Sequence, residues 1–203
     1  MKLLKKVDTL EVKRCFVMTH FLRKFGVAGV RSTNIPTREK YLQALQKAKH
    51  TISQLSEKQL DKVVGVYKKR LRAYNKAEWY IGEVGVKEVG VWRGAGGLPM
   101  SWTHSSLFET AKKVKEGLKT ETKEIKKRSR VAIPAILTFK TIIKKEKYLL
   151  PIIFSGGTGT NGRRKQVAKQ KFDIDDGNMR AVAFAISGDK KIKAYIGIKS
   201  VIK

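Results

Sequence analysis

A large excess of positive charge constrains this chain more than any other feature of its sequence. The 203 residues include 45 lysines and arginines against 17 aspartates and glutamates, which gives a formal net charge of +28 at pH 7. A compact fold with this balance repels itself in water, so we expect a polyanion to lie close to it. The charge therefore predicts contact with nucleic acid, without separating DNA from RNA or indicating a sequence preference.

The positive charge is spread along the whole chain rather than gathered in a tail. Residues 1–100 carry 21 basic and 8 acidic side chains, and residues 101–203 carry 24 and 9. A catalytic domain with a single cationic cleft would show a more local excess. The even spread is typical of a protein that meets phosphates on several faces, as subunits of a nucleoprotein particle do. Enrichment in lysine that serves only solubility is the alternative interpretation.

The composition allows a folded core and indicates a reducing compartment. With 41% hydrophobic residues, the chain is long enough for one domain or two small ones. Its single cysteine, Cys15, lies in an apolar run, so we expect a buried, unreactive thiol and no intramolecular disulfide. No stretch approaches the roughly 18 apolar residues of a membrane span. Since charges interrupt the N-terminal segment, a signal peptide is not expected either. We therefore expect a protein without membrane contact that is not secreted and is cytoplasmic or packed in a virion or other nucleoprotein particle.

Three helices are predicted in the first 76 residues. A capping pattern at Asp8 begins a helix over about 9–25, and Pro36-Thr37 begins a second. A capping pattern at Ser56 begins a third helix over about 57–76, where apolar residues recur at three- and four-residue spacing.

The third predicted helix has a basic face that leads into two aromatic residues, Trp79 and Tyr80. Cations next to flat rings suit a surface that follows phosphates and stacks bases. We favour phosphate contact for the basic run and packing in the core for the two aromatics. The candidate binding residues here are Lys68, Lys69, Arg70 and Arg72.

A glycine-rich segment at 94–99 suggests a hinge between two regions. Alternating valines just before it indicate one or two short strands. The sequence thus predicts a helical region with short strands at its end over 1–93, and a basic helix with an antiparallel β region over 94–203.

A long basic helix is predicted near 106–128. Apolar residues from Leu107 to Ile125 mark one seam, and lysines and arginines crowd the rest of the helix surface. Few acidic side chains oppose them, so this helix is the first candidate for nucleic-acid contact. The alternative is a helix that pairs through its seam with another protein chain. The candidate binding residues here are Lys112, Lys113, Lys119, Lys126, Lys127 and Arg128.

The pattern beyond residue 130 favours strands. The expected strands are 131–137, 148–154, 179–186 and 192–198, with a hairpin turn over 187–190 between the last two. The predicted fold class is therefore α+β: an N-terminal helical region, a long basic helix and a small C-terminal antiparallel β-sheet.

The segment 157–162 matches the glycine pattern of a dinucleotide-binding turn. The residues after it are too few and too polar for the crossover helix that such a fold needs. We expect instead that Asn161-Gly162 turns a long hairpin, a basic finger that reaches nucleic acid. Its candidate binding residues are Arg163, Arg164, Lys165, Lys169 and Lys171.

Candidates for catalysis or metal binding are few. Asp173, Asp175 and Asp176 form an acidic cluster that would hold magnesium if the carboxylates converged. Asp175 to Asn178 is also an ordinary turn sequence, and we favour the turn. The three histidines have no metal-ligand spacing. No cofactor, metal or catalytic residue is predicted.

Taken together, these patterns favour a binding protein over an enzyme. We expect it to contact nucleic acid mainly through the phosphate backbone, within a larger assembly with other protein subunits. Two alternatives stay open. A magnesium-dependent nuclease or recombination enzyme requires the aspartates to converge, and a structural protein of a viral or phage particle requires a protein interface along the seam of helix 106–128. The oligomeric state and the host or viral origin are not specified.

Overall fold

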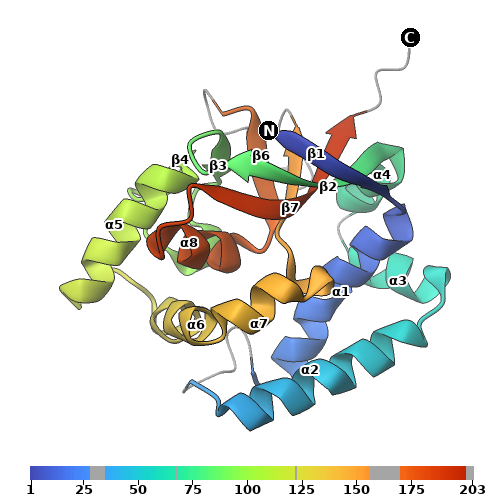
Figure 1. The fold of residues 1–203 in the computed structure, drawn as a ribbon, viewed down its shortest axis with the longest axis horizontal. Helices are drawn as coiled ribbons and strands as arrows, with labels where there is room; N and C mark the ends of the chain where they lie inside the picture. The colour runs from blue at the N-terminus through green and yellow to red at the C-terminus, as the bar shows by residue number, and fades with distance from the viewer. Residues whose placement is uncertain (28–34, 67, 122, 156–169, 200–203) are drawn as a thin grey trace.

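A seven-stranded mixed sheet organises the fold (Figure 1). The computed structural model describes residues 1–203 apart from 28–34, 67, 122, 156–169 and 200–203. The strand order is β1-β2-β7-β5-β6-β3-β4. The pairs β7–β5 and β6–β3 are parallel, and the other four neighbouring pairs are antiparallel. The strands are β1 (Lys2–Val7), β2 (Ala77–Gly85), β3 (Val89–Val91), β4 (Ser105–Ser106), β5 (Ile152–Ser155), β6 (Phe172–Asp176) and β7 (Lys191–Lys199).

The three predicted N-terminal helix starts are confirmed by their caps. The Asp8 carboxylate accepts the backbone N–H of Leu10 at the start of α1 (Thr9–Lys24), and Thr37 caps α2 (Arg38–Ser53). Ser56 and Gln59 form a capping box at α3 (Glu57–Val64). The predicted single helix over 57–76 is wrong, because α3 ends at Gly65 and α4 (Lys68–Lys76) follows as a separate helix.

The predicted long helix over 106–128 is also two helices. Ser106 caps α5 (Leu107–Lys119) by accepting the backbone N–H of Glu109, and the chain leaves the helix at Glu121, whose φ is 50°. The next helix, α6 (Lys127–Thr138), includes Pro134, and α7 (Lys140–Lys145) follows it. The short 3-10 turns are η2 (Ala95–Gly97) and η3 (Lys147–Leu149).

The α+β class is as predicted, but the small C-terminal antiparallel sheet is wrong. Residues 131–137 lie in α6, and residues 179–186 lie in α8 (Asn178–Ile186), so neither segment is a strand. The predicted hairpin between 179–186 and 192–198 is therefore absent, since α8 precedes β7. An apolar run of this length is compatible with a buried helix as well as with a strand. Here α5 and α6 both pack against α8, which makes a helix that is apolar on nearly every side stable.

The sheet combines strands from both sides of residues 94–99. β2 pairs with β7 along nine residues, and β3 pairs with β6. Within 94–99, Ala95 is fully buried and Leu98 is 3% exposed. Strands β5 and β6 pair antiparallel. The predicted hairpin tip lies outside the described residues.

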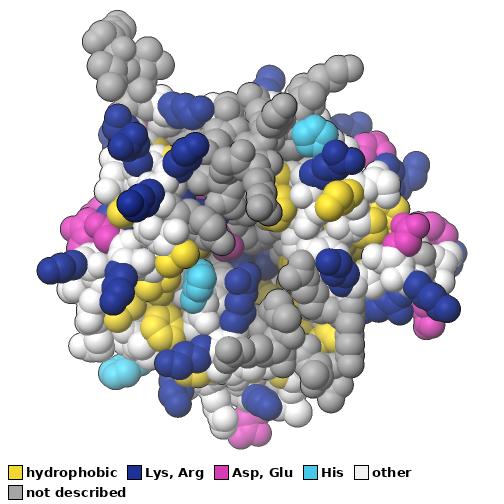
Figure 2. Space-filling model, turned by 180° about the vertical axis from the view of Figure 1, so that it is seen from behind, with side chains coloured by type: hydrophobic (Ala, Val, Ile, Leu, Met, Phe, Trp, Pro, Cys, Tyr) yellow, Lys and Arg dark blue, Asp and Glu magenta, His cyan; other side chains and the backbone are white. Residues whose placement is uncertain are grey.

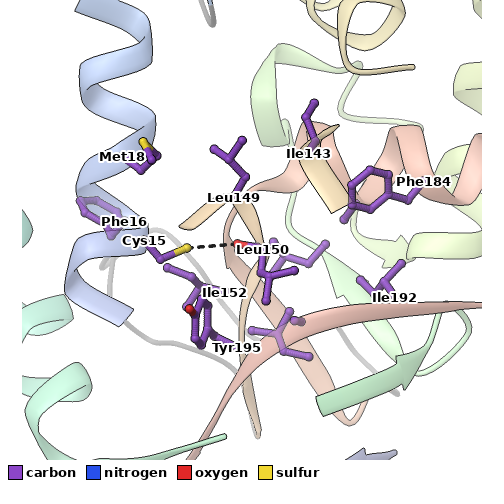
Figure 3. Packing of buried hydrophobic residues seen from close by; sticks show 14 of the residues in the cluster. Cys15, Phe16, Met18, Ile143, Leu149, Leu150, Ile152, Phe184, Ile192 and Tyr195 are labelled. Atoms are coloured by element: carbon purple, nitrogen blue, oxygen red, sulfur yellow. Dashed lines mark hydrogen bonds between the residues drawn. The ribbon is translucent and has the colours of Figure 1, made fainter. Parts of the chain in front are cut away.

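One hydrophobic core lies between the sheet and helices α1, α6, α7 and α8 (Figure 3). Ile152 of β5 and Tyr195 of β7, with Leu149 of η3, lie buried on the side of the sheet that faces α1. Cys15 lies in this core, where its thiol donates to the backbone oxygen of Leu150 (3.2 Å). Burial raises the pKa of the thiol well above its ordinary value. The predicted buried, free cysteine is confirmed.

Candidate functional site

A cavity of about 290 Å³ opens where strand β6 meets helix α8. Its walls come from α1, α2, α6 and α7, so segments distant in the sequence converge on it. Polar residues gather at the β6–α8 end, and apolar residues line the rest. The polar lining residues are Thr19, His20, Arg23, Arg70, Asp175, Asp176, Asn178 and Arg180.

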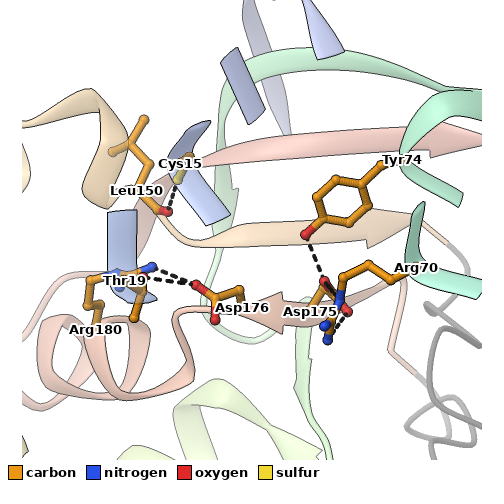
Figure 4. Close-up of polar contacts among 8 residues, drawn as sticks. All are labelled: Cys15, Thr19, Arg70, Tyr74, Leu150, Asp175, Asp176 and Arg180. Atoms are coloured by element: carbon orange, nitrogen blue, oxygen red, sulfur yellow. Dashed lines mark hydrogen bonds and ion pairs between the residues drawn. The ribbon is translucent and has the colours of Figure 1, made fainter. Parts of the chain in front are cut away.

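A buried ion pair closes one side of the polar end (Figure 4). The Arg70 Nε atom of α4 lies 2.9 Å from Asp175 Oδ2 of β6, and Nη2 lies 3.4 Å from Oδ1. The Tyr74 hydroxyl donates to the same carboxylate at 2.8 Å. Burial, the largest single effect, acts to lower the pKa of Arg70, but the charge and hydrogen bond of Asp175, together with Tyr74 and Asp176, outweigh it and raise that pKa. Burial and Asp175 together raise the pKa of Tyr74 well above its ordinary value.

A second ion pair forms one residue further along β6. Arg180 Nη2 donates to Asp176 Oδ2 at 3.1 Å, and Arg180 Nη1 donates to the Thr19 hydroxyl at 3.0 Å (Figure 4). Burial acts to raise the pKa of Asp176, but Arg180, then Arg23 and Arg70, outweigh it and lower that pKa. The two neighbouring carboxylates thus face different guanidinium groups, and both are neutralised.

The start of α8 contributes backbone donors to this end of the cavity. Gly177, at φ 86°, turns the chain from β6 into α8, and no side chain caps the helix. An added Cβ at Gly177 would lie 2.7 Å from Arg180 Nη2 and 3.0 Å from the Pro151 Cα, so glycine is required. Asn178 is 8% exposed, lines the cavity, and its Oδ1 has no hydrogen-bond partner among the described residues.

The field inside the cavity is positive on balance. Arg23, Arg70 and Arg180 line it with two carboxylates, and the first turn of α8 adds the partial positive charge of a helix N-terminus. The pKa of His20 is lowered, first by burial and then by the charges of Arg23 and Arg70. A helix start without a side-chain cap, with one guanidinium in excess over the two carboxylates, suits an anionic group.

The four basic candidates of the third predicted helix do not all lie on the surface. Lys68, Lys69 and Arg72 lie exposed on α4, as the prediction of phosphate contact requires. Arg70 is 3% exposed and paired with Asp175, so its side chain stabilises the fold. It is therefore not available on the surface for the predicted phosphate contact. Trp79 is 1% exposed, which agrees with packing in the core.

The α5 candidates Lys112, Lys113 and Lys119 all lie exposed, and so does Lys126. Lys127 and Arg128 are in the first turn of α6. The predicted seam faces inward: Leu107 and Val114 are fully buried, and α5 packs against α8 of the same chain. The seam therefore offers no surface to a second protein.

The predicted basic finger lies mostly outside the described residues. Arg163, Arg164, Lys165 and Lys169 belong to that part, so the structure does not place them. Lys171 is described, and its exposed ammonium group lies 4.0 Å from the Glu88 carboxylate.

Lys and Arg side chains are spread over the face shown in Figure 2, while most Asp and Glu side chains lie toward its margins. Positive side chains are thus spread widely over the part of this face that the structure describes.

The acidic cluster is not the turn that the sequence suggested. Asp173, Asp175 and Asp176 lie in β6, and only Gly177 makes the turn. Among the described residues, no group of three or more His, Cys, Asp or Glu side chains has the arrangement of a metal site.

Sequence reasoning missed Thr19, Gly177, Asn178 and Arg180 as site residues. The available signal was the sequence Asp-Asp-Gly-Asn followed by an apolar run. This order fits a simple turn, but it fits equally well the end of a strand, a left-handed glycine and the start of an uncapped helix.

Comparison of the chain with protein-family models, with curated proteins and with solved structures finds no match. Within the described ranges, no helix combines the length and apolar character needed to cross a bilayer.

Proposed function

We propose that this protein binds nucleic acid through the phosphate backbone as a component of a larger nucleoprotein assembly. The observation that carries the proposal is the exposed excess of lysine and arginine on elements far apart in the sequence, above all on α4 and α5. Separate basic elements neutralise several phosphates at once, and the release of condensed counterions then drives binding.

A salt titration tests the proposal. We expect the affinity for unrelated DNA and RNA sequences to fall steeply and about equally with salt, with a log-log slope that corresponds to about six or more phosphate contacts. Affinity that is independent of salt would contradict the proposal.

Matched charge variants locate the binding surface. The triple variant Lys112→Gln, Lys115→Gln, Lys119→Gln removes three exposed charges from α5. Its control, Lys40→Gln, Lys58→Gln, Lys62→Gln, removes three exposed charges from α2 and α3. Both variants have the same net charge, so a larger loss of affinity in the α5 variant assigns a specific role to that helix. Equal losses would mean that only total charge matters.

A second candidate function concerns the cavity, and the unpaired Asn178 Oδ1 favours it. An uncapped helix start, the Arg23 guanidinium outside the two ion pairs, and the buried Asn178 acceptor suit a small ligand with both an anionic group and a hydrogen-bond donor. The apolar wall, which includes Leu22, Ile136 and Ile143, would cover the ligand's uncharged part.

Calorimetric titration with inorganic phosphate and with adenosine monophosphate tests the second candidate. The near-isosteric change Asn178→Asp adds a negative charge inside the cavity and should abolish binding of either probe. Asn75→Asp adds the same charge at an exposed position of α4 and should leave it intact. Equal binding by both variants, or none by wild type, would contradict a ligand role for the cavity.

A cleavage assay distinguishes the nuclease alternative from the binding proposal. Asp175 and Asp176 are each neutralised by an arginine, which opposes a metal role for these two carboxylates. Magnesium- or manganese-dependent cutting of DNA or RNA by purified wild type would nevertheless replace the binding proposal with an enzymatic one.

A further inference from the structure

Helix α5 carries an exposed aromatic ring at the start of its basic surface. Phe108 is 41% exposed, although it directly follows the fully buried Leu107. Its backbone N–H donates to the Val86 oxygen (3.1 Å), and the Ser106 cap fixes the first turn of the helix. The ring is therefore presented from a well-anchored position on a regular element.

Phe108 and three lysines share one line along α5. Lys112, Lys115 and Lys119 follow Phe108 at spacings of four, three and four residues, which places them on one helix face. All four side chains are exposed. At 1.5 Å per residue the line is about 16 Å long. Glu109 and Glu116 each follow a member of the line by one residue, so they flank the line on the side of Lys112.

A further cation lies over the ring. The Lys87 Nζ atom, from the turn between β2 and β3, is 5.2 Å from the centroid of Phe108. An ammonium group there interacts with the ring face and is placed beside any base that stacks on the exposed part of the ring.

We infer that the line Phe108–Lys112–Lys115–Lys119, with Lys87, is a binding track for single-stranded nucleic acid on which one base stacks on Phe108. An exposed aromatic ring beside a row of lysines favours a single strand over a duplex, because only an unpaired base has a free π-face that can stack on the ring. The inference rests on the proposed nucleic-acid function and adds to it a preference for unpaired strands.

Fluorescence anisotropy with four probes of equal phosphate number tests the inference: a thymidine 12-mer, a uridine 12-mer, an abasic 12-mer and a hairpin duplex. We expect Phe108→Leu to weaken binding of the thymidine and uridine strands by roughly 5- to 150-fold, the range of one lost base stack. The abasic strand and the duplex should bind the variant as they bind wild type.

Two control variants keep the test specific. Phe108→Trp retains a stacking surface and should keep wild-type affinity. Met100→Leu changes another exposed apolar residue, 64% exposed, and should have no effect. Loss of affinity on all four probes, or on none, would overturn the stacking role. Failure of wild type to bind any probe would instead contradict the proposed function itself.

Discussion

The Arg70 guanidinium donates to the Asp175 carboxylate across 105 positions of sequence and anchors helix α4 to strand β6. Arg70 is also positioned over the ring of Phe16, 4.7 Å from its centroid, so the pair is enclosed by aromatic and apolar groups. Arg70 thus belongs to the interior, although the preceding residue, Lys69, is exposed. Helix α4 thus has one exposed basic surface and one side that packs into the fold.

Removing Arg70 should destabilise the protein without acting as a binding mutation. Arg70→Ala leaves the Asp175 carboxylate buried without its cation, which typically costs about 3–5 kcal/mol of the free energy of unfolding. Lys69→Ala, on the exposed side of the same helix, should change stability by less than about 0.5 kcal/mol. Urea denaturation of both variants measures the difference. Similar small effects would mean that water solvates the pair.

The triple variant Asp173→Asn, Asp175→Asn, Asp176→Asn should also lose stability. The sequence alone predicted a tolerant turn at this place, but in β6 two of these carboxylates pair with buried or nearly buried guanidinium groups. We expect a loss at least as large as that of Arg70→Ala, seen as a lower melting temperature. Unchanged thermal stability would contradict the ion-pair assignment.

Acid should weaken the fold partly through Asp176. Its pKa in the folded state is below the ordinary value of 3.8, so its contribution to stability is complete above that value and is lost as the pH falls through the lower, folded pKa. The stability difference between wild type and Asp176→Asn should therefore be constant near pH 6 and shrink below about pH 4. Denaturation curves at several pH values give this difference directly, and a gap that persisted at low pH would argue against the charge effect.

Two glycines provide a matched test of the turn into α8. Gly177 and Gly188 have φ of 86° and 90°, but an added Cβ is crowded only at Gly177. Gly188→Ala should cost about 1–2 kcal/mol for the left-handed conformation alone. Gly177→Ala should cost more, because the Arg180 and Pro151 contacts must also shift. Chemical denaturation ranks the two, and the reverse order would contradict the crowding.

Cys15 should be unreactive in the native protein. Burial raises the pKa of its thiol, so little thiolate is available to react. A chromogenic disulfide reagent should modify it only after unfolding by urea. Rapid modification of the folded protein would indicate frequent opening of the contact between α1 and Leu150.

The sequence by itself determined local features whose causes are local. The caps at Asp8, Ser56 and Ser106 fix helix starts because a side chain a few residues away satisfies the first backbone donors. The apolar seam of α5 likewise follows from the spacing of its apolar residues, and the burial of Cys15 follows from the apolar run around it.

Only the tertiary structure decided what depends on distant partners. The run 179–186 is a helix rather than a strand because α5 and α6 cover it, and the sheet is mixed because β7 lies between β2 and β5. Arg70 and Lys69 are adjacent cations with the same local pattern, yet one is buried against Asp175 and the other is exposed. Local spacing cannot separate them, because the carboxylate that draws Arg70 inward lies more than a hundred residues away and reaches it only through the packing of α4 against the sheet.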